Sequence, residues 1–247
     1  MIAVISPAKN MKRDITEIKP TISSFPQQTR QLAQHLKQYS AWQLEELMHI
    51  NPKLAMEAFA DFQDFCWDAP GTPALLAYHG LQYRNIGAKD FTAEDFAFAN
   101  EHLRIISGFY GLLRPSDQIQ PYRLEMGGKV RIDGMDLYQF WGDTLRRELF
   151  ASGEVVIDLA SKEYGKAVWP NTQVPGTCIA CSFLVMRGGK LKTLATLAKM
   201  ARGQMVRQMI KERWTQPQQL QQFAWEGFCF DEIRSQPHQY VYVQNGG

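Results

Sequence analysis

The sequence predicts a single domain of the mixed α/β (α+β) class. Short apolar runs, such as residues 2–6 and 154–161, have the length and composition of buried strands. Longer stretches, such as residues 193–213, repeat their apolar residues at helical spacing. Strands and helices mix without an internal repeat, a low-complexity tract or a linker rich in Pro, Gly and Ser. Residues 1–247 are therefore expected to fold as one domain.

The first predicted elements are a strand and a group of helices. Residues 2–6 end at a Ser-Pro pair, as a buried first strand would. Residues 23–65 then have helical apolar spacing. Ser40 and Asn51 stand at N-cap positions, and Pro52 occupies the first position of a helix.

The middle of the chain is expected to alternate between strands and helices. A turn rich in Pro and Gly precedes residues 75–80, which predict a second strand. Residues 92–103 predict a helix with Thr92 as the N-cap and Asp95 at the third position. Residues 104–108 have strand character.

The C-terminal half begins with the clearest amphipathic helix, at residues 134–150, which opens with a capping box of Asp136 and Gln139. Seven further elements are predicted after it. They are a buried strand (154–161), a short helix (162–168), a strand with its hairpin (176–193), a long helix (193–213), another short helix (217–223) and two closing strands (226–232 and 240–244). The long helix is expected to be continuous or to consist of two helices hinged at Gly203.

Composition excludes several classes of protein. The chain is 45% hydrophobic and 21% charged, with a net charge of +2 and a pI near 8.3. Any nucleic-acid surface would therefore be a local patch. The apolar N-terminal run is too short for a signal peptide, and no run reaches the length of about 18 residues that a membrane span needs. The four cysteines do not suggest a secreted disulfide framework. We expect a cytoplasmic protein without a membrane partner.

Familiar catalytic and cofactor motifs are missing from the sequence. It contains no Walker loop, no G-x-G-x-x-G and no G-x-S-x-G, and its five histidines have no metal-ligand spacing. Cys178 and Cys181 form a C-x-x-C pair, but within a predicted strand their side chains would point to opposite faces. We interpret both as structural cysteines and expect no metal and no cofactor.

Basic side chains recur where predicted elements end, and α/β proteins often place functional sites at such ends. Lys9 follows the first strand, and Lys199 and Arg202 share one face of the long helix. Residues 105–126 interleave glycines, aromatic rings and arginines. Together these features indicate an anion-binding cleft, with contributions from Lys9, Arg114, Arg123, Lys162, Lys166, Lys199 and Arg202. Each cation taken alone is better explained as a solvated charge, and their joint occurrence after strand ends favours the cleft.

Aromatic residues near these cations suggest contacts with a base. Tyr110, Tyr122 and Trp141 could stack on one, and packing in the core is the alternative for each. Residues 104–113 also resemble the turn of a helix-hairpin-helix motif, with Gly108 and Gly111 allowing a phosphate to approach the backbone. The motif's glycines are usually two apart, whereas these are three apart.

A second stretch could form such an element, since residues 198–209 would be two helical segments around Gly203. Acidic residues also fall at predicted element ends. Glu125, Asp143 and Glu163 are possible acid/base residues, as is Asp158, and ion pairing with neighbouring arginines is the alternative.

Several sequence blocks resemble one known family in the same order along the chain. They are "ISPAK" (5–9), "SGFYGLLRPSDQIQPYRLEMG" (107–127), "DLYQFWGD" (136–143), "DLASKEY" (158–164), "KMARG" (199–203) and "EGFCFDE" (226–232). The chain is similar in these blocks to the YaaA family of peroxide-stress proteins. The resemblance spans essentially the whole chain, and the C-x-x-C pair lies outside the matching blocks.

The resemblance implies a cytoplasmic protein that protects the cell from hydrogen peroxide by limiting free intracellular iron and the resulting DNA damage. It also implies an unusual mixed α/β topology with a positively charged cleft, a helix-hairpin-helix-like element, and binding of double-stranded or distorted DNA. Carried over residue by residue, the implied cleft consists of Lys9, Arg114, Tyr122, Arg123, Lys166, Lys199 and Arg202. Glu125 would lie beside Arg123, either orienting its guanidinium or acting on a ligand.

The sequence supports two alternative functions. The first is a DNA-binding protein without sequence specificity, whose affinity falls steeply with salt. The second is an enzyme acting on a nucleotide or nucleobase in the same cleft, with the carboxylates as acid and base. Direct sequestration of iron is disfavoured, because the chain has no close spacing of His and carboxylate ligands.

Overall fold

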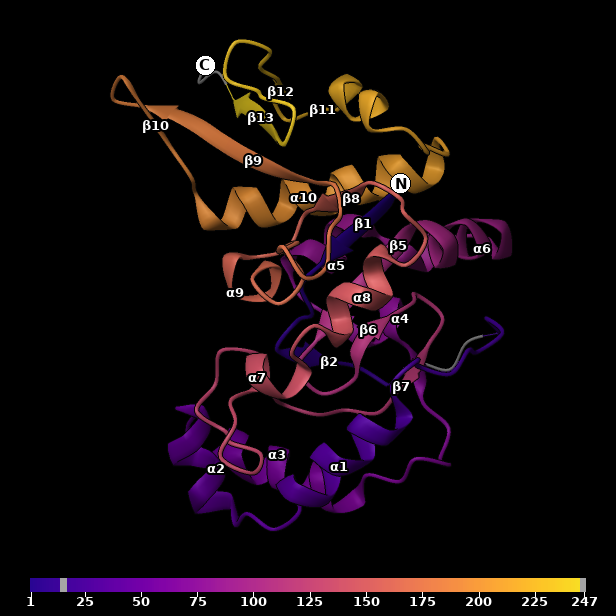
Figure 1. The fold of residues 1–247 in the computed structure, drawn as a ribbon, viewed down its shortest axis with the longest axis vertical. Coiled ribbons are helices and arrows are strands. Elements are labelled where there is room, and N and C mark those ends of the chain that lie inside the picture. The colour runs from indigo at the N-terminus through magenta and orange to yellow at the C-terminus, as the bar shows by residue number, and fades with distance from the viewer. Residues whose placement is uncertain (14–16, 245–247) are drawn as a thin grey trace.

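The computed structural model describes residues 1–13 and 17–244. Its largest element is a mixed sheet with the strand order β11-β12-β13-β9-β8-β1-β5-β6, in which β10 pairs with β9 (Figure 1). The parallel strands are β13 (Gln239–Gln244), β9 (Cys178–Arg187), β8 (Val156–Asp158), β1 (Ile2–Ile5) and β5 (Leu103–Ser107). The antiparallel strands are β11 (Ala224–Trp225), β12 (Phe228–Phe230), β10 (Lys190–Lys192) and β6 (Gly111–Leu113). The expected mixed α/β class is confirmed.

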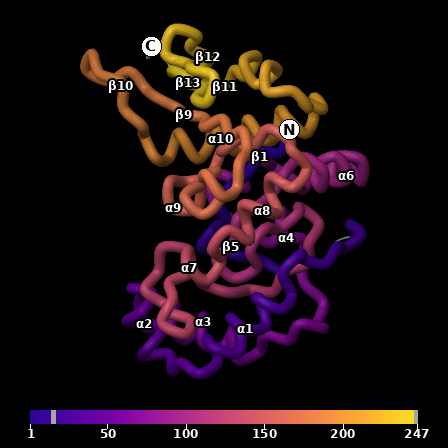
Figure 2. The backbone as a smooth tube through the Cα atoms, viewed as in Figure 1, coloured from indigo at the N-terminus to yellow at the C-terminus, as the bar shows by residue number. Residues whose placement is uncertain are grey.

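Short strand pairs and helices surround this sheet. The pairs are β2 (Asn10–Met11) with β4 (Tyr78–His79), and β3 (Thr72–Pro73) with β7 (Gln118–Ile119). The helices are α1 (Pro26–Leu36), α2 (Ala41–Met48), α3 (Pro52–Asp64), α4 (Ala74–Ala77), α5 (Leu81–Ile86), η1 (Ala88–Asp90), α6 (Ala93–His102), α7 (Leu137–Trp141), α8 (Thr144–Phe150), α9 (Lys162–Gly165), α10 (Ala195–Lys211) and η2 (Pro217–Gln222). Helices α1 to α3 gather at one end of the molecule, and β11 to β13 form the opposite end (Figure 2).

The N-caps expected from the sequence are present. Ser40 and Thr92 accept hydrogen bonds from the backbone N–H three residues on, at 3.4 and 3.2 Å. Asn51 accepts one from Leu54 at 2.9 Å, and Asp136 accepts one from Gln139 at 2.9 Å. Each bond satisfies a donor that the first turn of a helix cannot pair internally, so these helices begin where the sequence predicts.

Strand β1 lies at the centre of the fold. Ala3, Val4 and Ile5 are fully buried, and the strand pairs with β5 on one side and β8 on the other. A parallel strand covered on both faces is expected to be apolar throughout, which explains the uninterrupted run at the N-terminus. The buried core that surrounds β1 is one hydrophobic cluster, and it includes residues as far apart in sequence as Leu32 and Tyr242.

The order of the parallel strands reverses at β1. The chain first goes from β1 to β5 on one side, and later returns to β8, β9 and β13 on the other side. In open parallel sheets such a reversal leaves a crevice beyond the carboxyl ends of the two diverging strands, where ligands commonly bind. In this chain the loops after Ile5 and after Asp158 border that crevice.

Two local predictions are wrong. Residues 75–80 form helix α4 and the two-residue strand β4 instead of one strand, because Ala74 and Leu75 donate to the carbonyls of Asp117 and Pro115. The helix expected at residues 134–150 is two helices, α7 and α8, broken at Gly142, whose φ is +47°. Apolar spacing alone does not detect either interruption.

The hinge considered at Gly203 is also absent, because α10 runs unbroken from Ala195 to Lys211. A Cβ atom at Gly203 would lie 2.3 Å from the carbonyl oxygen of Gln82 and 2.8 Å from the Cβ of Asn85, both in α5. The glycine therefore lets the two helices pack closely.

Neither stretch considered for a helix-hairpin-helix element has two helices around a turn. Residues 103–113 form an antiparallel β-hairpin in which Ser107 pairs with Gly111. Gly111, with φ +78°, makes the turn, and a Cβ there would clash with Phe25 and Trp141. A Cβ at Gly108 would lie 2.9 Å from the carbonyl oxygen of Leu124. Both glycines serve packing in the interior and are buried, which corrects their expected contact with a phosphate.

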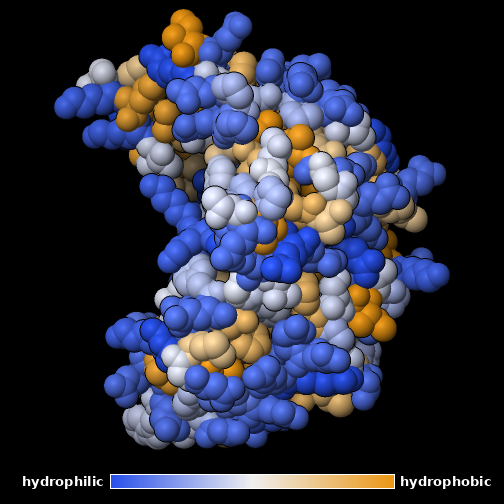
Figure 3. Space-filling view, in the orientation of Figure 1, coloured by the Kyte–Doolittle hydropathy of each residue, from blue (hydrophilic) through white to orange (hydrophobic). Residues whose placement is uncertain are grey.

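The surface seen in Figure 3 is mostly hydrophilic, and its outline is indented between β10 and α2. Among the residues that the structure describes, no helix is both long and apolar enough to cross a membrane.

Candidate functional site

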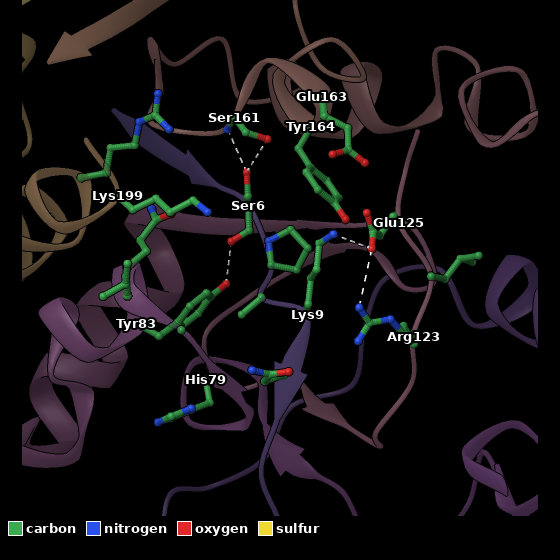
Figure 4. A pocket seen from close by; sticks show the side chains of 18 of the residues that line it. Ser6, Lys9, His79, Tyr83, Arg123, Glu125, Ser161, Glu163, Tyr164 and Lys199 are labelled. Atoms are coloured by element: carbon green, nitrogen blue, oxygen red, sulfur yellow. Dashed lines mark hydrogen bonds and ion pairs between the residues drawn. The ribbon is translucent and has the colours of Figure 1, made fainter. Parts of the chain in front are cut away.

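A cavity of about 410 Å³ lies at the carboxyl ends of β1 and β8, in the crevice where the strand order reverses. We call it the strand-end cavity. Its walls come from the loop after β1, the start of α5, the segment 122–125, the start of α9 and the middle of α10 (Figure 4). The site thus combines segments from distant parts of the sequence.

Hydrogen bonds hold two of these walls together. The backbone N–H of Ser161 donates to the Ser6 hydroxyl at 2.8 Å, and the two hydroxyl oxygens are 3.2 Å apart. The Tyr83 hydroxyl donates to the backbone carbonyl of Ser6 at 2.8 Å. These bonds fix the loop after β1 against the loop after β8, so the two serine hydroxyls face the cavity from defined positions (Figure 4).

An ion-pair group lies on another wall. The ammonium of Lys9 is 2.8 Å from a carboxylate oxygen of Glu125, and the guanidinium of Arg123 is 3.9 Å from the same oxygen. Glu163 lies near Glu125 (Figure 4) and accepts a hydrogen bond from the backbone N–H of Gly127 at 2.9 Å. The cavity therefore holds carboxylates as well as cations.

Helix α10 supplies two more cations. Lys199 and Arg202, which the sequence places on one helix face, both line the cavity. Burial lowers the pKa of Arg202, and the nearby carboxylate of Asp158 opposes that shift. Burial also raises the pKa of Asp158, which accepts a hydrogen bond from the Ala160 N–H at 2.8 Å. The Asp158 carboxylate thus partly offsets the cost of burying the Arg202 guanidinium.

Several buried donors of this cavity have no acceptor among the described residues. They are the Nε atoms of Arg123 and Arg202 and the side-chain nitrogen of Gln82. Buried donors in proteins nearly always have a partner, and an unpaired donor costs free energy. These three donors belong to residues that line one cavity, and the guanidinium groups among them are suited to the oxygens of an anion.

The structure brings together seven of the residues predicted for the site. Lys9, Tyr122, Arg123, Lys199 and Arg202 line the strand-end cavity, together with the possible acid/base residues Glu125 and Glu163. Tyr122 is only 7% exposed, and its hydroxyl lies 2.7 Å from those of Tyr78 and Ser107. Burial raises its pKa to about 12, so this hydroxyl stays protonated at neutral pH.

Other predicted residues lie outside the strand-end cavity. Arg114 pairs with Asp117 and donates to the carbonyl of Ile22, and the ammonium of Lys166 lies 4.4 Å from the centre of the Tyr138 ring. Asp143 pairs with an arginine and an asparagine, and their hydrogen bonds lower its pKa. These groups have partners of their own within the protein.

The buried aromatic residues have structural roles. Tyr110 and Trp141 are at most 2% exposed, and Trp141 donates to the carbonyl of Gly108 at 3.0 Å. Neither ring is therefore accessible for stacking on a base.

Sequence reasoning missed Ser6, Ser161 and Gln82. Ser6 and Ser161 are the last residues of predicted strands, and Lys9 was identified from its place after such a strand end, so the same rule would have found them. Gln82 carries no such signal, because it reaches the cavity through the packing of α5 on α10.

The cysteines and metal ligands add nothing to this site. Cys178 and Cys181 lie in β9, where burial raises the pKa of each thiol. A high pKa keeps a thiol protonated and unreactive. In the described part of the chain, no group of three or more His, Cys, Asp and Glu side chains is placed to hold a metal ion.

A second cavity of about 510 Å³ adjoins the first, and we call it the side cavity. Lys9, Arg123, Glu125 and Glu163 line both cavities. The far wall of the side cavity is apolar and comes from the end of α2 and the turn that follows, with Leu47, Met48 and Ile50 half-buried there. The carboxylates thus lie at the junction of the two cavities.

The fold and site define an α/β protein with a charged cavity at the reversal point of its parallel strands. The sequence profile of the family described as "Peroxide stress protein YaaA" matches residues 1–234, and this chain belongs to that family. It is similar to UPF0246 proteins of Acaryochloris marina and Saccharophagus degradans, at 42% and 41% identity, and to one of Clostridioides difficile at 37%. Each comparison covers 99% of this chain and at least 99% of the relative.

Proposed function

We propose that this protein acts in the cytoplasm during peroxide stress by binding DNA through the cations of the strand-end cavity. The binding would be independent of base sequence and would limit oxidative and iron-dependent damage to the DNA. The family description supports the link to peroxide stress. One structural observation supports the anionic ligand: Lys9, Arg123, Lys199 and Arg202 line one cavity.

The charge distribution suits a local contact with phosphate groups. The net charge of the chain is only +2, so attraction over the whole surface is weak. Lys9 and Lys199 are exposed at the cavity, where they can meet a phosphate group on the outside of a duplex. Such contacts release counterions, and the affinity is therefore expected to fall with salt.

The test is fluorescence anisotropy of a labelled duplex and a bubble DNA across a salt series. The double variant Arg123→Ala/Lys199→Ala is compared with Lys53→Ala/Arg234→Ala, which removes the same two charges outside the cavity. We expect the cavity variant alone to lose most of the binding. Its slope of log affinity against log salt should fall by up to about 1.8, because each phosphate contact contributes about 0.9. Thermal unfolding establishes that both variants fold.

Equal losses in the two variants, or binding that does not respond to salt, would contradict the proposal.

A second candidate is an enzyme that acts on a nucleotide or nucleobase. Glu125 and Glu163 favour it, because they place two carboxylates beside cations at a strand-order reversal. Incubation with a panel of nucleotides, followed by chromatography, tests this function. We expect turnover by the native protein and its loss in Glu163→Gln; a lack of turnover across the panel removes the candidate.

A further inference from the structure

We infer that the strand-end cavity and the side cavity together bind a single nucleotide unit, with its phosphate in the first and its nucleoside in the second. This inference rests on the proposed binding of DNA or nucleotides and names the part of the ligand that the site would take. The nucleotide unit could be a free mononucleotide or one that has left the base stack of a DNA molecule.

The depth of the side chains that line the strand-end cavity argues for a small ligand. Gln82 is 8% exposed, and the side chain of Arg123 is 14% exposed. Phosphates in an intact duplex could approach Lys9 and Lys199 at the cavity edge, but a paired strand is too bulky to enter a cavity of about 410 Å³. That volume lies within the range of small-molecule sites. A compact group that enters the cavity can lie against the guanidinium groups of Arg123 and Arg202.

The chemistry of the strand-end cavity favours a phosphate there. A phosphate has several acceptor oxygens, and the cavity offers donors from the Ser161 hydroxyl, Lys199 and Arg202. When the Ser6 hydroxyl donates to that of Ser161, the Ser161 hydroxyl proton is left free for a ligand.

The carboxylates determine the direction in which the ligand lies. Glu125 and Glu163 balance the charges of Lys9 and Arg123 at the junction of the two cavities. Lys199 and Arg202 line the strand-end cavity alone, so the remaining positive charge that favours a phosphate lies there. Carboxylates accept hydrogen bonds from sugar hydroxyls and from the amino groups of bases. The nucleoside would therefore pass the junction, and its phosphate would remain near α10.

The side cavity can hold the rest of the nucleoside. It has about 510 Å³ of space, and the half-buried side chains of Leu47, Met48 and Ile50 give it an apolar wall. A base removed from its stack loses apolar contacts, and an apolar wall can replace them.

The first experiment measures binding of free ligands by calorimetry. The probes are a panel of nucleoside monophosphates and inorganic phosphate, and the proteins are the native chain, Ile50→Trp and the control Met56→Trp. Ile50 lines the side cavity, whereas Met56 is 58% exposed on α3 and lines neither of the two cavities. We expect at least one monophosphate to bind about tenfold or more tighter than inorganic phosphate, the equivalent of about 1.4 kcal/mol. Ile50→Trp should remove that advantage without changing phosphate binding, and Met56→Trp should keep it.

The second experiment distinguishes the sources of the nucleotide. Anisotropy compares a fully paired duplex with the same duplex carrying one extrahelical nucleotide. Preferential binding of the second duplex, abolished by Ile50→Trp but not by Met56→Trp, indicates a nucleotide that belongs to DNA. Binding of free monophosphates without any such preference indicates a free nucleotide, and both results support the inference.

The inference and the proposed DNA binding can fail separately. The inference would be overturned, and the proposed function would stand, if duplex binding depends on salt but two other effects are absent. These are tighter binding of a monophosphate than of inorganic phosphate, and tighter binding of the duplex that carries an extrahelical nucleotide. Binding of a monophosphate without any binding of DNA would do the reverse. Identical behaviour of Ile50→Trp and Met56→Trp with every ligand would also overturn the inference.

Discussion

Glu125 forms ion pairs with two of the cations that line the strand-end cavity. Its carboxylate lies 2.8 Å from the Lys9 ammonium and 3.9 Å from the guanidinium of Arg123. A phosphate that binds either cation therefore competes with Glu125. The side chain of Lys9 is 64% exposed, so this pair is screened by water and can exchange partners at little cost.

The variant Glu125→Gln should consequently bind duplex DNA more tightly. Removing the carboxylate frees Lys9 for a phosphate, so we expect a several-fold gain in affinity and a salt slope larger by up to about 0.9. Anisotropy at a series of salt concentrations measures both quantities. Weaker binding by Glu125→Gln would mean that Glu125 orients the cations for the ligand.

Asp95 illustrates a charged residue with a structural role. Burial raises its pKa, but hydrogen bonds from Lys211, the Thr92 backbone and Arg213 outweigh burial and lower the pKa to about 2. These contacts join the start of α6 to the end of α10 and to the turn that follows it, with side-chain distances of 2.6 and 2.8 Å. A carboxylate whose pKa is lower in the folded state stabilises the fold above its unfolded pKa of about 3.9.

The variant Asp95→Asn should lower the free energy of unfolding at pH 7 by roughly 1.5–3 kcal/mol, the range for hydrogen bonds to charged groups. In the native protein this contribution is lost as the pH falls from about 4 to about 2. Urea unfolding at pH 7 and at pH 3 measures it. The difference between variant and native protein should shrink at pH 3, and a constant difference would contradict the assigned ion pairs.

At the scale of elements, the packing of α10 on α5 determines the position of Lys199, Arg202 and Gln82 around the cavity. Gly203 permits this contact, because a side chain there would meet the backbone of Gln82. Alanine favours a helix over glycine by about 1 kcal/mol, so Gly203→Ala would stabilise a helix that did not pack at this point.

We expect Gly203→Ala to destabilise the protein by about 1–3 kcal/mol, the usual cost of overpacking. Thr196→Ala, at an exposed position of the same helix, provides the control and should change stability little. Thermal unfolding compares the two variants. A stabilised Gly203→Ala would show that α10 is free to move away from α5.

The sequence identified the elements with strong local signals. Asn51-Pro52 and the box of Asp136 and Gln139 mark helix starts, and the apolar runs of β1 and β8 mark strands. The break at Gly142 and the packing role of Gly203 depend on tertiary contacts or on backbone angles. Spacing of apolar residues contains neither kind of information.

At the scale of the whole molecule, the strand order explains why distant residues share one site. Lys9 and Ser161 are far apart in sequence but follow strands that lie side by side. The sequence predicts that the two residues lie at the same edge of the sheet, because side chains after parallel strands meet there. The sequence does not predict the contribution of Gln82, since it depends on how the helices pack over that edge.

The most direct test of DNA binding at this cavity is hydrogen exchange of the protein with and without a saturating short DNA duplex. We expect slower exchange on DNA binding in the segments around Lys9, Arg123 and Ser161, all of which line the strand-end cavity. Protection confined to another surface, such as α1 to α3, would contradict the assignment of DNA binding to this cavity.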